Sequence, residues 1–265
     1  MEIIDIFGYL GALLIGVVLG LIGGGGSILT VPVLVYLFGL NPVTATAYSL
    51  FVVGTSALVG AVKNVKKGLV DLRTAAVFSV PAFIGVYITR KYLVPAIPEH
   101  LFNLAGFEIT KSVGIMLFFA VIMLLASFSM IKESSEDKNP TVKVRYNYPL
   151  ILLEGLVVGI LTGIVGAGGG FLIIPALVLL AKLPMKKAVA TSLLIIAVKS
   201  LIGFVGDIQN LEINWIFLLV FTALSIAGIF VGIYLNRFIG GEKLKKGFGW
   251  FVLFMALYIM FKELF

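Results

Sequence analysis

Two short runs of glycine interrupt apolar sequence and have the chemistry to bind an anion. Glycine is a poor helix former, by about 1 kcal/mol relative to alanine, so a helix should break at each run. We expect the next helices to begin near Ser27 and Phe171, with their N–H groups facing the break, where such groups form an anion site. Close helix packing is the alternative role of small residues. The candidate residues are Gly23, Gly24, Gly25, Gly26 and Ser27 in the first run, and Gly166, Gly168, Gly169 and Gly170 in the second.

Lys199 is a positive charge inside an otherwise uncharged apolar segment, residues 188–206. Ionisable groups at such depth usually face a cavity or a partner. We predict that Lys199 attracts and neutralises a bound anion. The alternatives are a side chain that reaches the membrane surface, or a structural pair with Glu154 or Asp207.

Hydroxyl side chains open the segments that follow the two predicted hairpins, residues 44–62 and 188–206. Ser49, with Thr46 and Tyr48, lies in the first half, and Thr191 and Ser192 lie in the second. Ser192 also shares a helical face with Lys199 two turns later. We predict that Ser49, Thr191 and Ser192 donate hydrogen bonds to an oxyanion. The alternative is helix capping or bonding to the neighbouring backbone.

Catalytic and metal-binding patterns are absent from the sequence. The 265 residues include no cysteine and a single histidine, His100, so neither a thiolate site nor a histidine cluster can form. No H-E-x-x-H pattern occurs, and no G-K-[ST] follows either glycine run. The net charge of +7 does not indicate nucleic acid, because no basic run is interleaved with aromatics. We therefore expect no enzyme activity, no cofactor, no metal and no nucleic-acid partner.

The composition indicates that these residues are held by membrane-spanning helices. The chain is 60% hydrophobic and 12% charged, against about 25% charged for a soluble domain, and its mean hydropathy is +1.15. No charge occurs from Ile6 to Val62, while one spanning helix needs about 20 residues. The predicted apolar segments are 3–22, 27–39, 44–62, 74–89, 112–131, 149–165, 170–181, 188–206, 213–236 and 247–261.

The two halves of the chain are related by an internal repeat. GLIGGGGSILTVP, from Gly20 to Pro32, aligns with GIVGAGGGFLIIP, from Gly163 to Pro175, at an offset of 143 residues. The register continues without a gap, so Ser49 falls on Ser192. Matches that fall on glycines and a proline and then keep register indicate duplication rather than shared apolar composition.

Charge distribution indicates that the halves are inverted relative to each other. The loop Lys63–Arg73 carries four positive charges, while its counterpart after residue 206 carries none. With Lys63–Arg73 inside, fifteen of the 20 Lys and Arg residues fall on the cytoplasmic side, which is a strong positive-inside bias. This count requires residues 149–183 and 3–39 to begin and end on the same side. We interpret each as a helical hairpin that enters the membrane and returns, and two complete short spans are the alternative. Both termini are then extracytoplasmic.

The glycine runs with their flanking residues resemble the sulfite exporter TauE/SafE family, also called the TSUP permeases. The resemblance rests on GLIGGGGSILTVPVL with ATAYSL, and on GIVGAGGGFLIIPALVLL with AVATSLL, and covers residues 5–262. It implies transport of sulfite, of sulfonates such as sulfoacetate, and of related small anions.

We therefore predict an all-α, multi-pass protein of the cell membrane. The first inverted repeat spans residues 1–133, a cytoplasmic linker 134–148, and the second repeat 149–265. Each repeat is a glycine-broken helical hairpin plus three transmembrane helices. The predicted function is a secondary transporter, an exporter of sulfite or organosulfonates coupled to protons, with the anion near the midplane between the two broken helices. Alternatives are a transporter of another small anion, such as a carboxylate, or an anion channel. The expected partners are this anion and the lipid bilayer.

Overall fold

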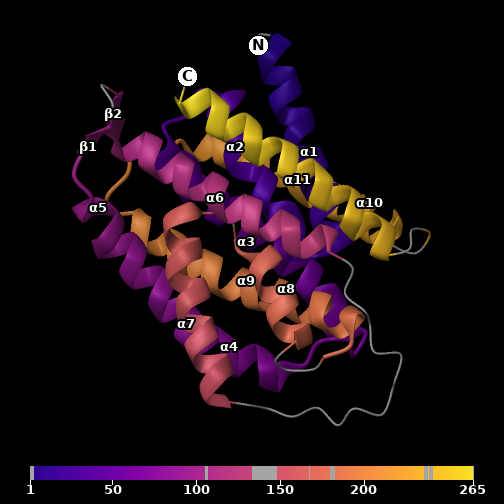
Figure 1. Cartoon of the computed structure of the whole chain (residues 1–265). Helices are drawn as coiled ribbons and strands as arrows, with labels where there is room; N and C mark the ends of the chain where they lie inside the picture. Colours follow the sequence, from indigo (N-terminus) through magenta and orange to yellow (C-terminus); the bar gives the residue numbers. More distant parts are fainter. Residues whose placement is uncertain are drawn as a thin grey trace.

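The computed structural model is helical along almost its whole length (Figure 1). It describes residues 3–104, 107–132, 148–166, 168–179, 183–235, 238 and 241–264, so the predicted linker lies outside the described residues except for Tyr148. The elements of the first half are α1 (Ile3–Ile22), the 3₁₀ helix η1 (Gly24–Leu29), α2 (Thr30–Tyr36), α3 (Pro42–Lys66), α4 (Leu72–Ile88), the π-helix η2 (Thr89–Leu93), α5 (Val94–Ala96), β1 (His100–Leu104), β2 (Phe107–Thr110) and α6 (Lys111–Ile131). Those of the second half are α7 (Tyr148–Val165), α8 (Gly170–Leu179), α9 (Met185–Asp207), α10 (Trp215–Leu235) and α11 (Gly241–Leu264).

Side-chain caps explain where several helices begin. Asn41 accepts a hydrogen bond from the Val43 N–H, and Pro42 takes the first helical position of α3. Asp71 caps α4 by accepting from the Thr74 N–H at 2.8 Å. These contacts satisfy N–H groups that have no acceptor inside the helix. Local sequence therefore sets the starts of the two helices that flank the charged loop Lys63–Arg73.

Every predicted apolar segment forms a helix, but two regions were not predicted: the helical extension over η2 and α5, and a hairpin. Residues 100–110 form an antiparallel hairpin, in which Leu104 pairs with Phe107. It connects α5 to α6 and lies at one end of the bundle (Figure 1). Its strands are too short and too mixed in composition to produce a clear period-two signal.

The offset of the sequence repeat recurs in the helix boundaries. Helix α3 begins at Pro42 and α9 at Met185, and α4 begins at Leu72 and α10 at Trp215, so both pairs are shifted by the same 143 residues. The packing exchanges partners between the halves: α1 packs on α10, and its counterpart α7 packs on α4. Helices α3 and α9 pack on each other in the middle of the bundle (Figure 1). These correspondences support the proposed division into two repeats.

The outer surface of the bundle is apolar, as a bilayer requires. Five helices among the described residues are long and apolar enough to cross a membrane, and α3 and α9 are the most buried of them. Large apolar side chains such as Leu14, Phe128 and Phe254 are exposed on the outside. Both ends of the chain lie at the same end of the bundle (Figure 1). The fold is thus that of an all-α, multi-pass membrane protein.

Candidate anion-binding site

The two glycine tracts meet in the interior of the bundle. Gly24 of η1 and Gly170 at the start of α8 are in backbone contact, because a Cβ added to either would overlap the other's backbone. A Cβ on Gly24 would also strike Ile196 of α9. Two broken helices from different halves of the chain therefore cross at a point where only glycine fits.

The tracts differ in backbone conformation. In the first, only Gly23 has a positive φ, and the helix resumes at once as a 3₁₀ turn from Gly24 that includes Gly25 and Ser27. We expected this helix to begin near Ser27. In the second tract Gly166, Gly168 and Gly169 all have positive φ, and α8 begins at Gly170 rather than near Phe171. The second tract therefore departs further from helical geometry than the first, and glycine is required there for its backbone angles.

Some tract glycines contact neighbouring helices rather than open space. A Cβ on Gly26 would strike the backbone of Leu19 in α1. One on Gly166 would strike Thr46 of α3, and one on Gly23 would lie 2.7 Å from Val189 Cγ1 of α9. For these three residues the packing role, which was the alternative interpretation, accounts for the need for glycine.

Helices α3 and α9 present equivalent faces to the two tracts. On α3, Gly166 contacts Thr46 and Gly168 contacts Val53, so Ser49 lies between the two contact points. On α9, Gly23 contacts Val189 and Gly24 contacts Ile196, with Ser192 between them. The repeat therefore places one serine of each half against the opposite half's glycine tract.

The two serines differ in their hydrogen bonds. Both are fully buried, and Ser192 Oγ donates to the Val189 carbonyl at 2.8 Å. Ser49 Oγ has no hydrogen-bond partner among the described residues. A buried hydroxyl without a partner is unusual, and it leaves Ser49 free to donate to a ligand.

Lys199 lies beside the second tract, one helical turn after Ile196. Its side chain is fully buried, and its Nζ donates to Thr162 Oγ1 of α7 at 2.6 Å. A Cβ on Gly169 would lie 3.0 Å from Lys199 Nζ, so the ammonium group borders the tract backbone. The structure thus brings Lys199 together with Gly169 of the second tract. Among the described residues its hydrogen-bond partner is Thr162 and not Glu154 or Asp207, and Asp207 pairs with Arg90 instead.

Thr162 was missed in the sequence. It lies in the first arm of the second hairpin, one turn before Gly166, and its repeat counterpart is the apolar Leu19. A polar residue at the position where the other half has leucine was the available signal. Thr162 Oγ1 also donates to the Val158 carbonyl at 2.6 Å, which leaves its lone pairs for the ammonium group.

Two other hydroxyls have structural partners. Thr191 Oγ1 accepts a hydrogen bond from the Asp71 N–H at 2.9 Å and so ties α9 to the start of α4. Ser27 Oγ donates to the Gly24 carbonyl at 2.7 Å and stabilises the turn of η1. Thr191 therefore makes a structural contact between two helices, which neither the site prediction nor the capping alternative described. Ser27 lies next to the crossing because it is bonded to the Gly24 carbonyl.

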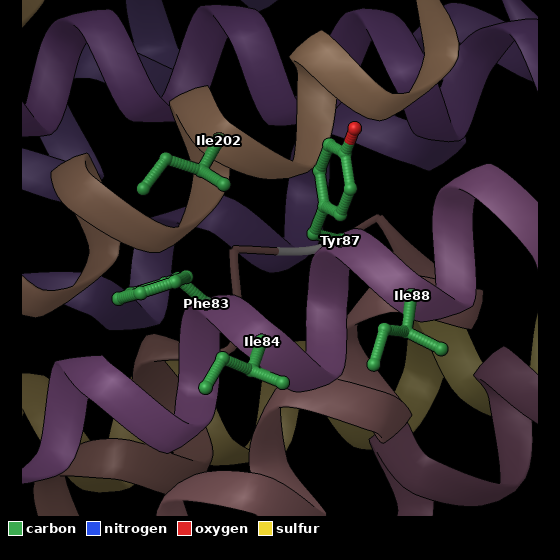
Figure 2. A pocket seen from close by; sticks show the side chains of 5 residues that line it. All are labelled: Phe83, Ile84, Tyr87, Ile88 and Ile202. Atoms are coloured by element: carbon green, nitrogen blue, oxygen red, sulfur yellow. The ribbon is translucent and has the colours of Figure 1, made fainter.

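An apolar hollow of about 310 Å³ lies elsewhere, between α4 and α9 (Figure 2). Figure 2 shows that Tyr87 is the one residue with a polar atom among those lining it. Ile84 and Ile88 in its wall are exposed on the outer face of the bundle. Because no charged group lines this hollow, it does not suit a small anion, and the glycine crossing remains the candidate site.

The fold is that of a helical membrane protein in which two broken helices meet in the interior, and comparison with known proteins identifies the family. The family model described as Sulfite exporter TauE/SafE matches residues 9–259. The chain belongs to this family. No solved structure matches it significantly.

Similar proteins are described as membrane transporters. A probable membrane transporter protein of Xylella fastidiosa (strain Temecula1) is 28% identical over 257 residues, which cover 94% of this chain and 92% of the relative. The probable membrane transporter protein YunE of Bacillus subtilis is 29% identical, covering 85% of this chain and 86% of the relative. One from Methanocaldococcus jannaschii is 34% identical, covering 42% of this chain and 44% of the relative. Family and relatives thus indicate a membrane transporter rather than an enzyme.

Proposed function

We propose that the protein is a secondary transporter that exports small sulfur-containing anions, such as sulfite or organosulfonates, coupled to protons. The observation that carries this proposal is the buried Lys199 ammonium group beside the contact of Gly24 with Gly170. A buried positive charge whose partner is a neutral hydroxyl lacks a counter-ion, and a small anion would supply one.

The groups around the crossing match the chemistry of an oxyanion. Lys199 provides charge, and Ser49 provides a buried hydroxyl without another partner. The first N–H groups of α8, from Gly170, point toward the second tract because a helix N-terminus leaves them without internal acceptors. Three kinds of donor suit an anion with several equivalent oxygens, such as sulfite or a sulfonate.

The repeat provides a route to alternating access. Each tract lies against the opposite half through α3 and α9, and the main helix contacts also join the two halves. Movement of one half against the other would open the crossing first to one side and then to the other, as in transporters built from inverted repeats. In the proposed orientation both termini and the β1–β2 hairpin are extracytoplasmic.

A binding screen with purified protein tests the proposal. Sulfite, thiosulfate, sulfoacetate, taurine and acetate are compared by thermal shift, because a ligand at 100 times its Kd stabilises by about 2.7 kcal/mol. We expect stabilisation by the sulfur oxyanions and not by taurine, a zwitterion whose ammonium group would add a second buried positive charge to that of Lys199. Stabilisation by acetate alone would replace the substrate class with carboxylates.

Counter-flow in proteoliposomes then distinguishes a carrier from a channel. If the protein is a carrier, proteoliposomes loaded with unlabelled sulfite accumulate labelled sulfite transiently. Each unlabelled anion that leaves brings the binding site back to the outside, where it binds a labelled anion. A channel shows no such overshoot. Absence of counter-flow together with a steady anion current would overturn the carrier proposal in favour of an anion channel.

A further inference from the structure

A second buried ionic pair lies at the end of α9 and is not explained by the anion site. Arg90 of η2 is fully buried, and its Nε lies 3.5 Å from Oδ2 of Asp207, whose side chain is only 3% exposed. Neither the three guanidinium nitrogens nor this Oδ2 makes a hydrogen bond to the described residues. A buried arginine with unused donors is costly, so a role beyond stability is expected.

This pair is connected to the candidate site by α9. Lys199 and Asp207 are eight residues apart, which is about 12 Å along a helix. Between them Gly203 and Gly206 let α4 approach closely: a Cβ on Gly206 would lie 3.2 Å from Arg90 Cβ. Thr89, next to Arg90, lies against Gly163, whose neighbour Thr162 bonds to Lys199. Buried polar groups thus lead from the glycine crossing to Arg90.

The other ionisable groups near this pair are bonded elsewhere or exposed, so Arg90 and Asp207 face each other as the two buried charges. On α4 and η2, Tyr87 and Lys91 bond to each other at 3.1 Å. Tyr48 of α3 accepts from the Asn214 N–H, and Glu212 after α9 is exposed. Helices α5 and α8 and the turn η1 contain no ionisable residue.

The remaining charges on the packed helices lie farther away. Glu154 of α7 is next to Gly155, which contacts Phe78 near the middle of α4 rather than η2. The other end of the bundle holds the remaining basic residues of these helices, namely Lys63, Lys66, Arg73, Lys186 and Lys187.

We propose that Arg90 and Asp207 couple protons to the transported anion, an inference that rests on the proposed anion transport. The anion replaces the Asp207 carboxylate at the Arg90 guanidinium, and Asp207 accepts one proton (hydronium) from the aqueous solution on the side from which the anion binds. When the anion leaves, Asp207 releases that proton and pairs with Arg90 again. One proton therefore travels in the same direction as each anion, so export by this route is driven by an outward gradient of the anion and opposed by an inward gradient of protons.

Electrostatics requires this exchange. The guanidinium fork matches an oxyanion as well as a carboxylate, so the two compete for the same donors. Two negative charges beside a single buried cation would leave one of them uncompensated, at a cost of several kcal/mol in such an environment. Protonation of Asp207 removes the excess charge. The arrangement is specific to one half of the repeat, because the counterpart of Asp207 is Asn64.

The test compares Asp207→Asn with Glu212→Gln, a matched change of an exposed carboxylate near the same helix end. Asparagine imitates the protonated acid and already occupies the equivalent position 64. In proteoliposomes with labelled sulfite and labelled thiosulfate, Asp207→Asn should retain anion exchange within a few-fold but lose accumulation driven by a pH gradient. Glu212→Gln should retain both. Accumulation that persists in Asp207→Asn overturns the proposal.

Wild-type protein alone provides a second readout, should Asp207→Asn fail to fold. Titration calorimetry of sulfite or thiosulfate binding in buffers of different ionisation enthalpy counts the protons taken up. We expect uptake of one proton for each thiosulfate bound. Thiosulfate is the cleaner probe, because its own charge stays constant near neutral pH. If anions exchange but neither proton uptake nor pH-driven accumulation is seen, the coupling role of Arg90 and Asp207 is refuted and the anion-transport proposal is unaffected. Failure of exchange with both anions refutes the transport proposal and, with it, this inference.

Discussion

Lys199 Nζ donates a hydrogen bond to Thr162 Oγ1 at 2.6 Å, and both side chains are buried at the border of the second glycine tract. The threonine hydroxyl donates onward to the Val158 carbonyl. The ammonium group is therefore positioned by a neutral acceptor and not by a carboxylate. This difference determines what mutation of either residue should do.

Replacement of Lys199 by methionine should weaken anion binding without unfolding the protein. Methionine keeps much of the length and removes the charge. Loss of a charge-assisted hydrogen bond costs about 1.5–3 kcal/mol, roughly a 10- to 100-fold loss in affinity. Stability should be unchanged or higher, because Thr162 still donates to Val158 and no buried group loses its only partner. Kd for sulfite and Tm measure the two effects, and unchanged affinity would remove Lys199 from the site.

The converse mutation, Thr162→Val, should act mainly on stability. Valine has nearly the same shape but cannot accept a hydrogen bond, so the buried Lys199 ammonium group loses its partner. The free energy of unfolding should fall by about 1–3 kcal/mol in the ligand-free protein. Bound sulfite should restore part of this loss by acting as a counter-ion. If the variant is as stable as wild type without ligand, the hydrogen bond contributes nothing measurable.

Much of the architecture could be predicted, because membrane-spanning helices require long apolar segments that are easily recognised in the sequence. Long apolar segments and the repeat at an offset of 143 residues are strong signals, and the helices follow them. The hairpin at residues 100–110 has no such signal. The family is likewise visible in the sequence, since the glycine tracts recur with their flanking residues.

The partners of the site residues could not be predicted in the same way. The sequence placed Lys199 within a membrane span. It could not predict the contact with Thr162, because that residue lies 37 positions earlier on another helix. It also suggested the same role for Thr191 and Ser49, although one is bonded to the Asp71 N–H and the other has no partner among the described residues. The predicted apolar segment 74–89 ended before Arg90, because the π-turn that extends this helix has no distinctive composition.

The glycine contact can be tested with Gly170→Ala. A methyl group there would overlap the Gly24 backbone and push the two broken helices apart. We expect at least a 10-fold loss of sulfite affinity in the folded fraction, together with a lower Tm. Gly247→Ala is the control, because nothing lies within 4 Å of the added methyl group and alanine favours a helix by about 1 kcal/mol. Wild-type affinity in Gly170→Ala would show that the crossing is not the binding site.

Ser49 and Thr191 should give opposite results. Ser49→Ala removes a buried hydroxyl without a partner, so stability should not fall, while sulfite affinity should drop several-fold. Thr191→Val removes the acceptor of the Asp71 N–H, so stability should fall by about 1 kcal/mol with no change in affinity. Measurement of Tm and of Kd for sulfite in both variants tests which of the two hydroxyls binds the anion. A weakened affinity in Thr191→Val alone would reverse the two assignments.

The orientation in the membrane can be tested with single cysteines, because the chain has no native cysteine. Lys67 follows α3 and His100 begins β1, both are exposed, and one spanning segment, Leu72–Ala96, separates them. The positive-inside bias predicts that Lys67→Cys is cytoplasmic and His100→Cys extracytoplasmic. A membrane-impermeant maleimide added to intact cells should therefore label His100→Cys at once and Lys67→Cys only after permeabilisation. Both variants should retain anion exchange, which confirms that the labelled protein is folded. The opposite labelling pattern would invert the topology and place Arg90 and Asp207 at the cytoplasmic end of the pathway.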